Sequence, residues 1–267
     1  MGPRGALVQP YYDQDAEEER LLVGAGPLEF LRTKQLLTRF LQPQSRIADV
    51  GGGTGRYAEW LSGEGHDVEL VDPMPLHVLR AEARAGGRFA VRLGDARELP
   101  FADETFDAVL LLGPLYHLDA REERLRALHQ AVRVCRHGGI VAAAAISRLA
   151  PLLGSARSRS ILVPEVLANV RDESRSGRRV PPERRTGLFP DAYFHLPGEL
   201  RAELGEAGLE VRAIFGVEGP AWLIDDFSAT WADDELRARI VAAADAVEED
   251  EHLVGLSPHL LAVAFRP

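Results

Sequence analysis

A turn rich in glycine is the part of the sequence best suited to bind a ligand. In the stretch ADVGGGTGRY, residues 48–57, four glycines occupy four of the five positions from Gly51 to Gly55, shortly after an aspartate. Ile47 and Val50 precede the glycines, and Trp60 and Leu61 follow them. This pattern predicts a short buried strand, a tight turn and the first turns of an amphipathic helix. Because such a turn exposes backbone N–H groups and a helix N-terminus, we expect it to bind a nucleotide-like ligand.

Two classes of ligand remain open for this turn. From Gly53 onward, GTGRYA fits the G-x-G-x-x-G/A pattern of dinucleotide-binding proteins, and Asp72 stands where their ribose-binding acid is expected. That pattern predicts a nicotinamide oxidoreductase. The other pattern starts earlier. In it an acid, Asp49, is followed by a glycine at every second position, namely Gly51, Gly53 and Gly55. A third class is excluded, because the only lysine, Lys34, has no glycine near it and a P-loop requires Gly-Lys-Ser/Thr.

Composition restricts the partners and the compartment. The formal net charge of −10 disfavours a nucleic acid as the main partner, because phosphate contacts require clustered cations. The single cysteine, Cys135, excludes an intramolecular disulfide and suits a reducing compartment, and we expect a buried structural thiol. We find neither the apolar core of a signal peptide nor an apolar run of about 18 residues, so we expect a cytoplasmic protein without a membrane partner.

Strands and helices alternate along most of the chain, which predicts an α/β fold with a doubly wound parallel sheet that binds ligands at the carboxyl ends of its strands. In the helix expected at 119–136, Asp119 is the candidate N-cap and Gly138 the stop. The segment 148–196 breaks the alternation with many arginines and prolines, and is either a lid over this edge or a solvated loop. We expect helices at 13–22, 27–41, 56–62, 75–85, 119–136, 197–208 and 233–251, and strands at 46–50, 67–72, 89–95, 106–113, 139–147, 209–219 and 259–267.

Four segments together make the sequence recognisable: DVGGGTG, LVDP, GDARELPFADETFDAVLLLGPLYHL and RVCRHGGIV. In order and spacing they resemble the class I S-adenosylmethionine-dependent methyltransferases, and most closely the small-molecule branch. The resemblance implies a Rossmann-like sheet of seven strands with the last strand antiparallel. We expect a single domain over 1–267, with an N-terminal helical flap at 1–45, a cofactor-binding core at 46–147, an inserted lid at 148–196 and the C-terminal part of the sheet at 197–267.

The resemblance also implies which residues bind S-adenosylmethionine. Asp49, Gly51, Gly53 and Gly55 match the loop under its methionine part, and Asp72 matches the acid that accepts both ribose hydroxyls. Asp95 matches the acceptor for the adenine amine, although an aspartate at that place also suits an ordinary turn. The remaining candidates are Pro73 and Met74 against the adenine, Ala96 at its edge, and Leu112 and Gly113 along the methionine moiety.

Methyl transfer needs the acceptor aligned and sometimes deprotonated. Tyr116 and His117 follow the strand expected at 106–113, and His117 is the first candidate for a general base, with cofactor binding or helix capping as its alternative. Tyr193 and His195 stand at the end of the inserted segment and are further catalytic candidates. We assign no metal ligand. GPLYHL replaces the Asn/Asp-Pro-Pro-aromatic stretch of the amino-methylating nucleic-acid members, so we expect a small-molecule acceptor.

Tyr11 and Tyr12 are candidates to close over the cofactor as a flap, and Arg32 or Arg56 to pair with its carboxylate; the alternatives are surface aromatics and solvated arginines. Two functional alternatives to methyl transfer stay open. One is a protein of the same fold that binds S-adenosylmethionine for other chemistry, such as cyclisation, or for sensing. The other is the nicotinamide oxidoreductase. The sequence does not indicate an oligomeric state.

Overall fold

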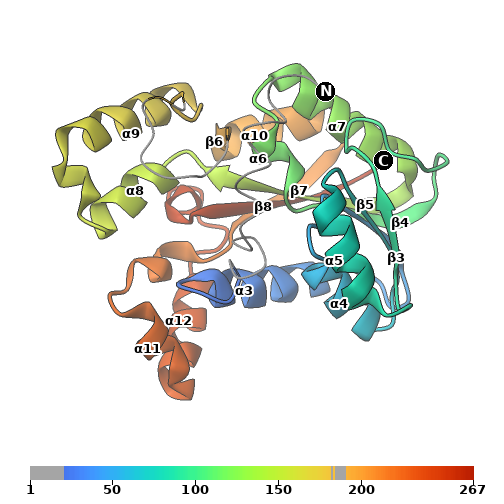
Figure 1. Cartoon of the computed structure of the whole chain (residues 1–267), viewed down its shortest axis with the longest axis horizontal. Coiled ribbons are helices and arrows are strands. Elements are labelled where there is room, and N and C mark those ends of the chain that lie inside the picture. The colour runs from blue at the N-terminus through green and yellow to red at the C-terminus, as the bar shows by residue number, and fades with distance from the viewer. Residues whose placement is uncertain (1–20, 182, 184–190) are drawn as a thin grey trace. The chain divides into compact units, whose positions relative to one another are not determined.

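The computed structural model describes residues 21–181, 183 and 191–267, whose strands form one sheet (Figure 1). The main strands follow the order β3-β2-β1-β4-β5-β8-β7, and the two-residue strand β6 pairs with the end of β5. Their bounds are β1 Arg46–Val50, β2 Asp67–Asp72, β3 Ala90–Leu93, β4 Phe106–Leu111, β5 Cys135–Ser147, β6 Phe194–His195, β7 Glu210–Gly216 and β8 His259–Phe265.

Strand direction confirms the expected class of fold. β1 runs parallel to β2 and β4, β2 parallel to β3, and β4 parallel to β5. The last strand, β8, is antiparallel, as the hydrogen bonds of Gly138 and Gly139 with Arg266 indicate. The sheet is therefore the doubly wound, Rossmann-like arrangement of seven strands with a final antiparallel strand that the resemblance implies.

Helices connect these strands, and most lie where the hydrophobic periodicity places them. The α-helices are α3 Gly26–Thr38, α4 Arg56–Gly63, α5 Pro75–Ala85, α6 Pro114–His117, α7 Arg121–Val134, α8 Ala150–Arg157, α9 Pro164–Ser176, α10 Pro197–Glu206, α11 Phe227–Ala232 and α12 Asp234–Asp245. Short 3-10 helices are η1 Ser160–Leu162, η3 Gly219–Leu223 and η4 Val254–Leu256. Within the part of the chain that the structure describes, no helix has the length and apolar character needed to span a membrane.

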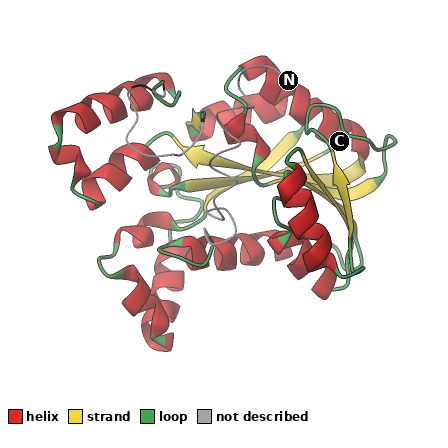
Figure 2. Ribbon diagram, viewed as in Figure 1, coloured by secondary structure: helices red, strands yellow, loops and turns green. Residues whose placement is uncertain are grey.

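The described chain divides into two compact units. The first runs to Leu36 and includes Ala145–Glu199 and Ile214–Leu261; the second comprises Leu37–Ala144, Leu200–Ala213 and Ala262–Pro267. In the second unit α4 and α5 pack against β2 and β3 (Figure 2). Nearly every residue of β1 and β4 is buried, as expected for strands covered on both faces. In the first unit, Leu28, Ala221, Phe227 and Ile240 form a core cluster, and α8 packs on α9.

The boundary between α7 and β5 differs from the sequence expectation. The N-cap of α7 is Ala120 rather than Asp119, and Gly138 lies within β5 instead of ending the helix. Residues 135–139 are drawn into the sheet because Cys135 pairs with Phe106 of β4 and Gly138 donates to the Arg266 carbonyl. Cys135 is nevertheless fully buried, as expected, and burial raises the pKa of its thiol to about 12.

Candidate functional site

The glycine turn between β1 and α4 has a backbone that suits glycine. Gly51, Gly53 and Gly55 have φ angles of 69°, 57° and 85°, in the left-handed region that side chains rarely adopt. A Cβ on Gly51 would lie 2.7 Å from Pro114 Cγ, whereas a Cβ on Gly53 would meet no atom of the described chain within 4 Å. Gly51 is therefore required by packing, and Gly53 borders open space.

Asp72, at the end of β2, ties this turn to the next helix. Its carboxylate accepts hydrogen bonds from the backbone N–H groups of Gly53 (2.9 Å) and Met74 (2.9 Å) and lies 3.0 Å from Nδ1 of His77. Asp72 and His77 are each only 4% exposed. A carboxylate offers about four acceptor positions, so three donors leave room for a further one, such as a ribose hydroxyl.

Asp49 lies in β1 directly before the turn and is fully buried. Burial, and secondarily the negative charge of Asp72, raise the pKa of Asp49 to about 7, against a weaker opposing effect of the Ala58 backbone N–H. A carboxyl group that changes charge near neutral pH responds strongly to a cationic ligand.

Asp95 follows β3 and is engaged by its own turn. The backbone N–H of Arg97 donates to its Oδ1 (2.8 Å), and the guanidinium donates to both carboxylate oxygens (2.9 and 2.5 Å). These hydrogen bonds with Arg97 lower the pKa of Asp95. Both sequence interpretations of Asp95 therefore keep support, since it initiates a turn and also presents a fixed carboxylate. Of the other adenine candidates, Pro73 is exposed, Met74 half-buried and Ala96 buried.

Tyr116 and His117 lie on α6, the single helical turn that follows the carboxyl end of β4. Tyr116 is 9% exposed, and its ring centroid lies 4.5 Å from that of His117. Gly113 begins this turn, and a Cβ there would lie 3.2 Å from the Gly51 carbonyl oxygen and 3.6 Å from the Tyr116 hydroxyl. The glycine turn and the candidate catalytic residues of α6 therefore meet, with half-buried Leu112 next to them.

Tyr193 and His195 belong to the first unit. Their ring centroids lie 4.7 Å apart, and His195 is fully buried in β6. Arg148 anchors this segment, donating to the Phe194 carbonyl (2.7 Å) and pairing with Glu199 (2.5 Å). The inserted segment is thus an ordered part of that unit in its described residues. It also holds a pocket of about 200 Å³ between α8 and α9, lined by polar groups that include Ser155, Asn169, Glu173 and Arg179.

The remaining cofactor candidates are placed differently. Arg32 is 1% exposed, and its guanidinium pairs with Glu248 and Asp245 of its own unit. Arg56 is the first residue of α4, directly after the turn. Tyr11 and Tyr12 lie outside the described residues.

The second unit brings together the candidates that follow β1, β2, β3 and β4, from Asp49 to His117. Sequence reasoning missed the partners of two of them, His77 on Asp72 and Arg97 on Asp95. His77 had a usable signal: a proline at the start of the helix predicts its first turn, and a histidine in that turn lies near the preceding strand end. Arg97 had the weaker signal of a basic residue two positions after a turn-forming aspartate.

Comparisons with known proteins find similarity over the segment that holds this site. Residues 48–143 match the model of the family described as "Methyltransferase domain". The demethylmenaquinone methyltransferase of Renibacterium salmoninarum is 32% identical over 161 residues, which cover 60% of this chain and 60% of that protein. The probable tRNA methyltransferase 9B of Homo sapiens is 38% identical over 104 residues, which cover 38% of this chain and 22% of that protein.

Among solved structures, the complex between the Haloferax volcanii Trm112 methyltransferase activator and a putative methyltransferase matches with a TM-score of 0.61 at 18% identity, covering 96% of this chain and 97% of that one. Identity this low shows a shared fold and nothing further. The matched part of the chain spans only about a fifth of the tRNA methyltransferase 9B relatives.

Proposed function

Residues 48–143 belong to the class I S-adenosylmethionine-dependent methyltransferases, and from this premise we propose that the protein transfers a methyl group from that cofactor to an O, N or C atom of a small-molecule acceptor. Of the two patterns that the sequence leaves open for the glycines, this membership supports the one that starts at Asp49. S-adenosylmethionine is accordingly the cofactor.

The observation that carries the proposal is the turn between β1 and α4 together with Asp72. Gly53 borders open space at a positive φ, and its N–H fixes the orientation of the Asp72 carboxylate. We assign the cofactor ribose to Asp72 and the methionine part to the turn and Gly113. Asp49 is buried beside them, and its pKa is raised to about 7. Once Asp49 is ionised, its carboxylate stabilises the positively charged methionine end of the cofactor.

The bound cofactor supplies an activated methyl group on a sulfonium, so the chain has to position the acceptor and, for an acceptor atom that loses a proton, to receive that proton. His117 suits the second task, because a neutral imidazole accepts a proton near neutral pH. Tyr116 packs against the His117 ring and limits the directions that it can adopt. We assign His117 as the general base, and Tyr116 as the group that positions it.

Charge and sequence support a small molecule over a nucleic acid. The net charge of −10 opposes binding of a polyanion, and GPLYHL lacks the stretch found in amino-methylating nucleic-acid members. The tRNA methyltransferase relatives match over about a fifth of their length, so their activity gives little support for a tRNA acceptor here. The lone buried cysteine supports our assignment to the cytoplasm.

Product analysis tests the proposal. The purified protein is incubated with S-adenosylmethionine and pools of small alcohols, phenols, amines and activated carbon acids, with bulk tRNA in a separate reaction. Mass spectrometry should find S-adenosylhomocysteine and one methylated small molecule. Methylthioadenosine would indicate intramolecular alkylation of the cofactor, and binding without any product would indicate a sensor. Methylated tRNA would contradict the proposed class of acceptor.

A second arm tests the assigned base. Replacing His117 by Gln should lower kcat and leave the affinity for S-adenosylhomocysteine unchanged, because the variant keeps a polar side chain that does not accept a proton near neutral pH. Equal losses of binding and kcat would assign His117 to cofactor binding instead.

A further inference from the structure

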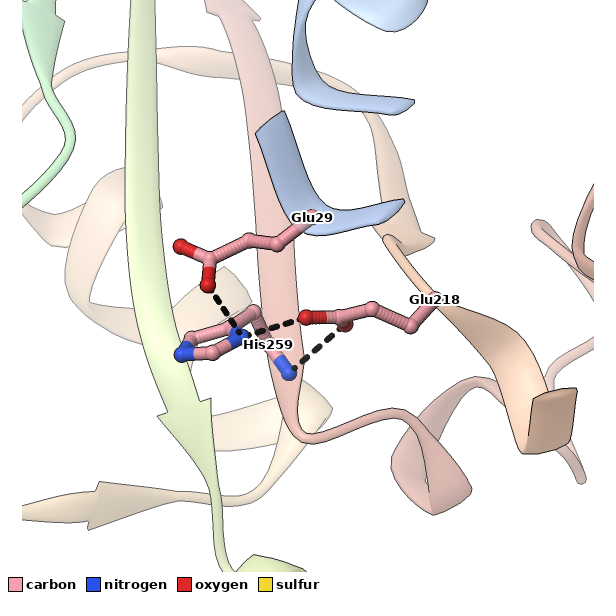
Figure 3. A group of neighbouring side chains, drawn as sticks. All are labelled: Glu29, Glu218 and His259. Carbon is pink, nitrogen blue, oxygen red and sulfur yellow. Dashed lines mark hydrogen bonds and ion pairs between the residues drawn. The ribbon is translucent and has the colours of Figure 1, made fainter. Parts of the chain in front are cut away.

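Two carboxylates and an imidazole meet in the first unit, apart from every residue assigned above. Glu29 lies on α3, Glu218 two residues after β7, and His259 at the start of β8 (Figure 3). One potential ligand atom from each residue lies within 4.8 Å of the other two. Carboxylate oxygen and imidazole nitrogen are the donors that proteins use to bind divalent first-row metal ions.

Burial makes the negative charge of this cluster costly without a cation. Glu218 is 1% exposed and Glu29 is 8% exposed. Within the part of the chain that the structure describes, no arginine or lysine pairs with Glu218, and its ionisable partner is His259. Removing a carboxylate from water costs free energy that a nearby positive charge offsets. The imidazole carries at most one positive charge, whereas a divalent ion brings two next to the buried Glu218 carboxylate.

The Glu218 carboxylate is oriented in advance. Its Oε2 accepts hydrogen bonds from the Ser257 hydroxyl (2.7 Å) and from the backbone N–H of His259 (3.2 Å). These bonds direct Oε1 toward Nδ1 of His259, at 2.5 Å (Figure 3). Metal ligands in proteins are commonly held in this way by hydrogen bonds to their outer atoms.

The separations of the donors suit a small ion. In a tetrahedral site with bonds of about 2.1 Å, ligand atoms lie about 3.4 Å apart. Nδ1 of His259 lies 3.6 Å from Oε2 of Glu29, which already matches. The shorter contact between Nδ1 and Glu218 is a hydrogen bond, which opens by about 1 Å when Nδ1 gives up its proton to bind a metal.

We propose that Glu29, Glu218 and His259 form a binding site for a divalent transition-metal ion of the Zn²⁺ class, with water completing its coordination. The ion links three segments that are remote in the sequence, namely α3, the residues after β7 and the start of β8. It therefore stabilises the first unit, and the site is independent of the proposed methyl transfer.

Titration of untagged protein with zinc tests the site. Protein freed of metal with EDTA should bind a single equivalent of Zn²⁺ by calorimetry and should melt at a higher temperature with the metal than without it. Substituting His259→Gln, Glu218→Gln or Glu29→Gln should each weaken zinc affinity roughly tenfold or more and abolish the thermal shift. The matched controls His252→Gln and Glu251→Gln change side chains that are 84% and 86% exposed, and should leave both readouts unchanged.

Two results would overturn the proposal: no stoichiometric binding to the wild-type protein, or binding that the three substitutions leave intact. In either case the cluster is a hydrogen-bonded ion pair only. If a variant fails to fold, the visible absorption spectrum of the wild-type protein loaded with Co²⁺ tests the proposed site instead. The intense bands of a low-coordinate site are expected, and the pale spectrum of hexaaqua cobalt would contradict the proposal. Affinity for S-adenosylhomocysteine, measured with and without zinc, should not change, which separates this test from that of the proposed function.

Discussion

At the scale of single residues, two buried aspartates at the ends of neighbouring strands differ in the hydrogen-bond donors around their carboxylates. Asp72 has three hydrogen-bond donors directed at its carboxylate. Among the described residues Asp49 has no comparable set, and burial together with the negative charge of Asp72 raises its pKa to about 7. The difference predicts that Asp49 responds to pH and that Asp72 depends on its donors.

The pH dependence of Asp49 has a definite sign. Between its ordinary value of 3.8 and about 7, folded Asp49 keeps a proton that the unfolded chain releases, so stability falls as pH rises through this interval. The free energy of unfolding of the wild-type protein should therefore fall by on the order of 2–4 kcal/mol between about pH 5 and about pH 8. Because Asn cannot ionise, the Asp49→Asn variant should not show this decrease. Urea unfolding at the two pH values measures it, with Asp67→Asn as the control because that side chain is 72% exposed. Parallel losses in Asp49→Asn and wild type would contradict the assignment.

His77 is predicted to act on the cofactor through Asp72. Leu in its place fills a similar space but donates nothing to the carboxylate, which should then adopt several orientations. Replacing His77 by Leu should cost about 1 kcal/mol of binding free energy, roughly a fivefold weaker dissociation constant for S-adenosylhomocysteine. His129→Leu on the exposed face of α7 is the control. An unchanged constant for His77→Leu would limit His77 to a structural role.

At the scale of elements, the turn between β1 and α4 is predicted to exclude any side chain from one position. Gly53 and Gly65 both have a positive φ, 57° and 90°, and open space at the Cβ position, so Val in either place meets backbone strain but no neighbouring atom of the described chain. Both variants should lose similar stability, but only Gly53→Val should lose binding of S-adenosylhomocysteine in calorimetry. Binding retained by a folded Gly53→Val variant would show that the turn does not contact the cofactor.

The inserted segment is predicted to serve the acceptor. The assigned cofactor residues belong to the second unit, whereas α8, α9 and the Tyr193–His195 pair belong to the first. Deleting residues 158–185 should therefore change the affinity for S-adenosylhomocysteine by less than roughly twofold and abolish turnover of the acceptor found by product analysis. Normal turnover by the deletion variant would mean that the acceptor binds elsewhere, and loss of cofactor binding would mean that the cofactor site extends into the first unit.

At the scale of the whole molecule, the sequence predicts the sheet because its strong local signals agree with the tertiary structure. β1, β2 and α5 begin and end at the expected residues, since apolar runs there are bounded by glycine, aspartate or proline. The predicted start of β5 was wrong. Residues 135–139 are part of the strand because they pair with Phe106 and Arg266, and no local sequence pattern reveals these contacts.

The candidate site follows the same rule. The motifs give the positions of Asp49, Gly53 and Asp72, but not the hydrogen bonds from His77 to Asp72 or from Arg97 to Asp95. The cluster of Glu29, Glu218 and His259 could not be predicted from the sequence, because its members are remote along the chain and their spacing matches no metal-binding motif. Contacts of this kind arise only when the chain is folded.

Calorimetric titration of S-adenosylhomocysteine into the wild-type protein and two variants tests whether Asp72 binds the cofactor. The two variants change residues at opposite ends of β2. Asp72→Ala removes the buried acid assigned to the ribose, and Asp67→Ala removes an exposed one. Wild type and Asp67→Ala should bind alike, whereas Asp72→Ala should bind more weakly by about 1–3 kcal/mol, with thermal melting showing that it is folded. Equal affinity in all three proteins would contradict the assignment of Asp72 to the cofactor ribose. Binding of NAD(H) in place of S-adenosylhomocysteine would contradict the cofactor itself.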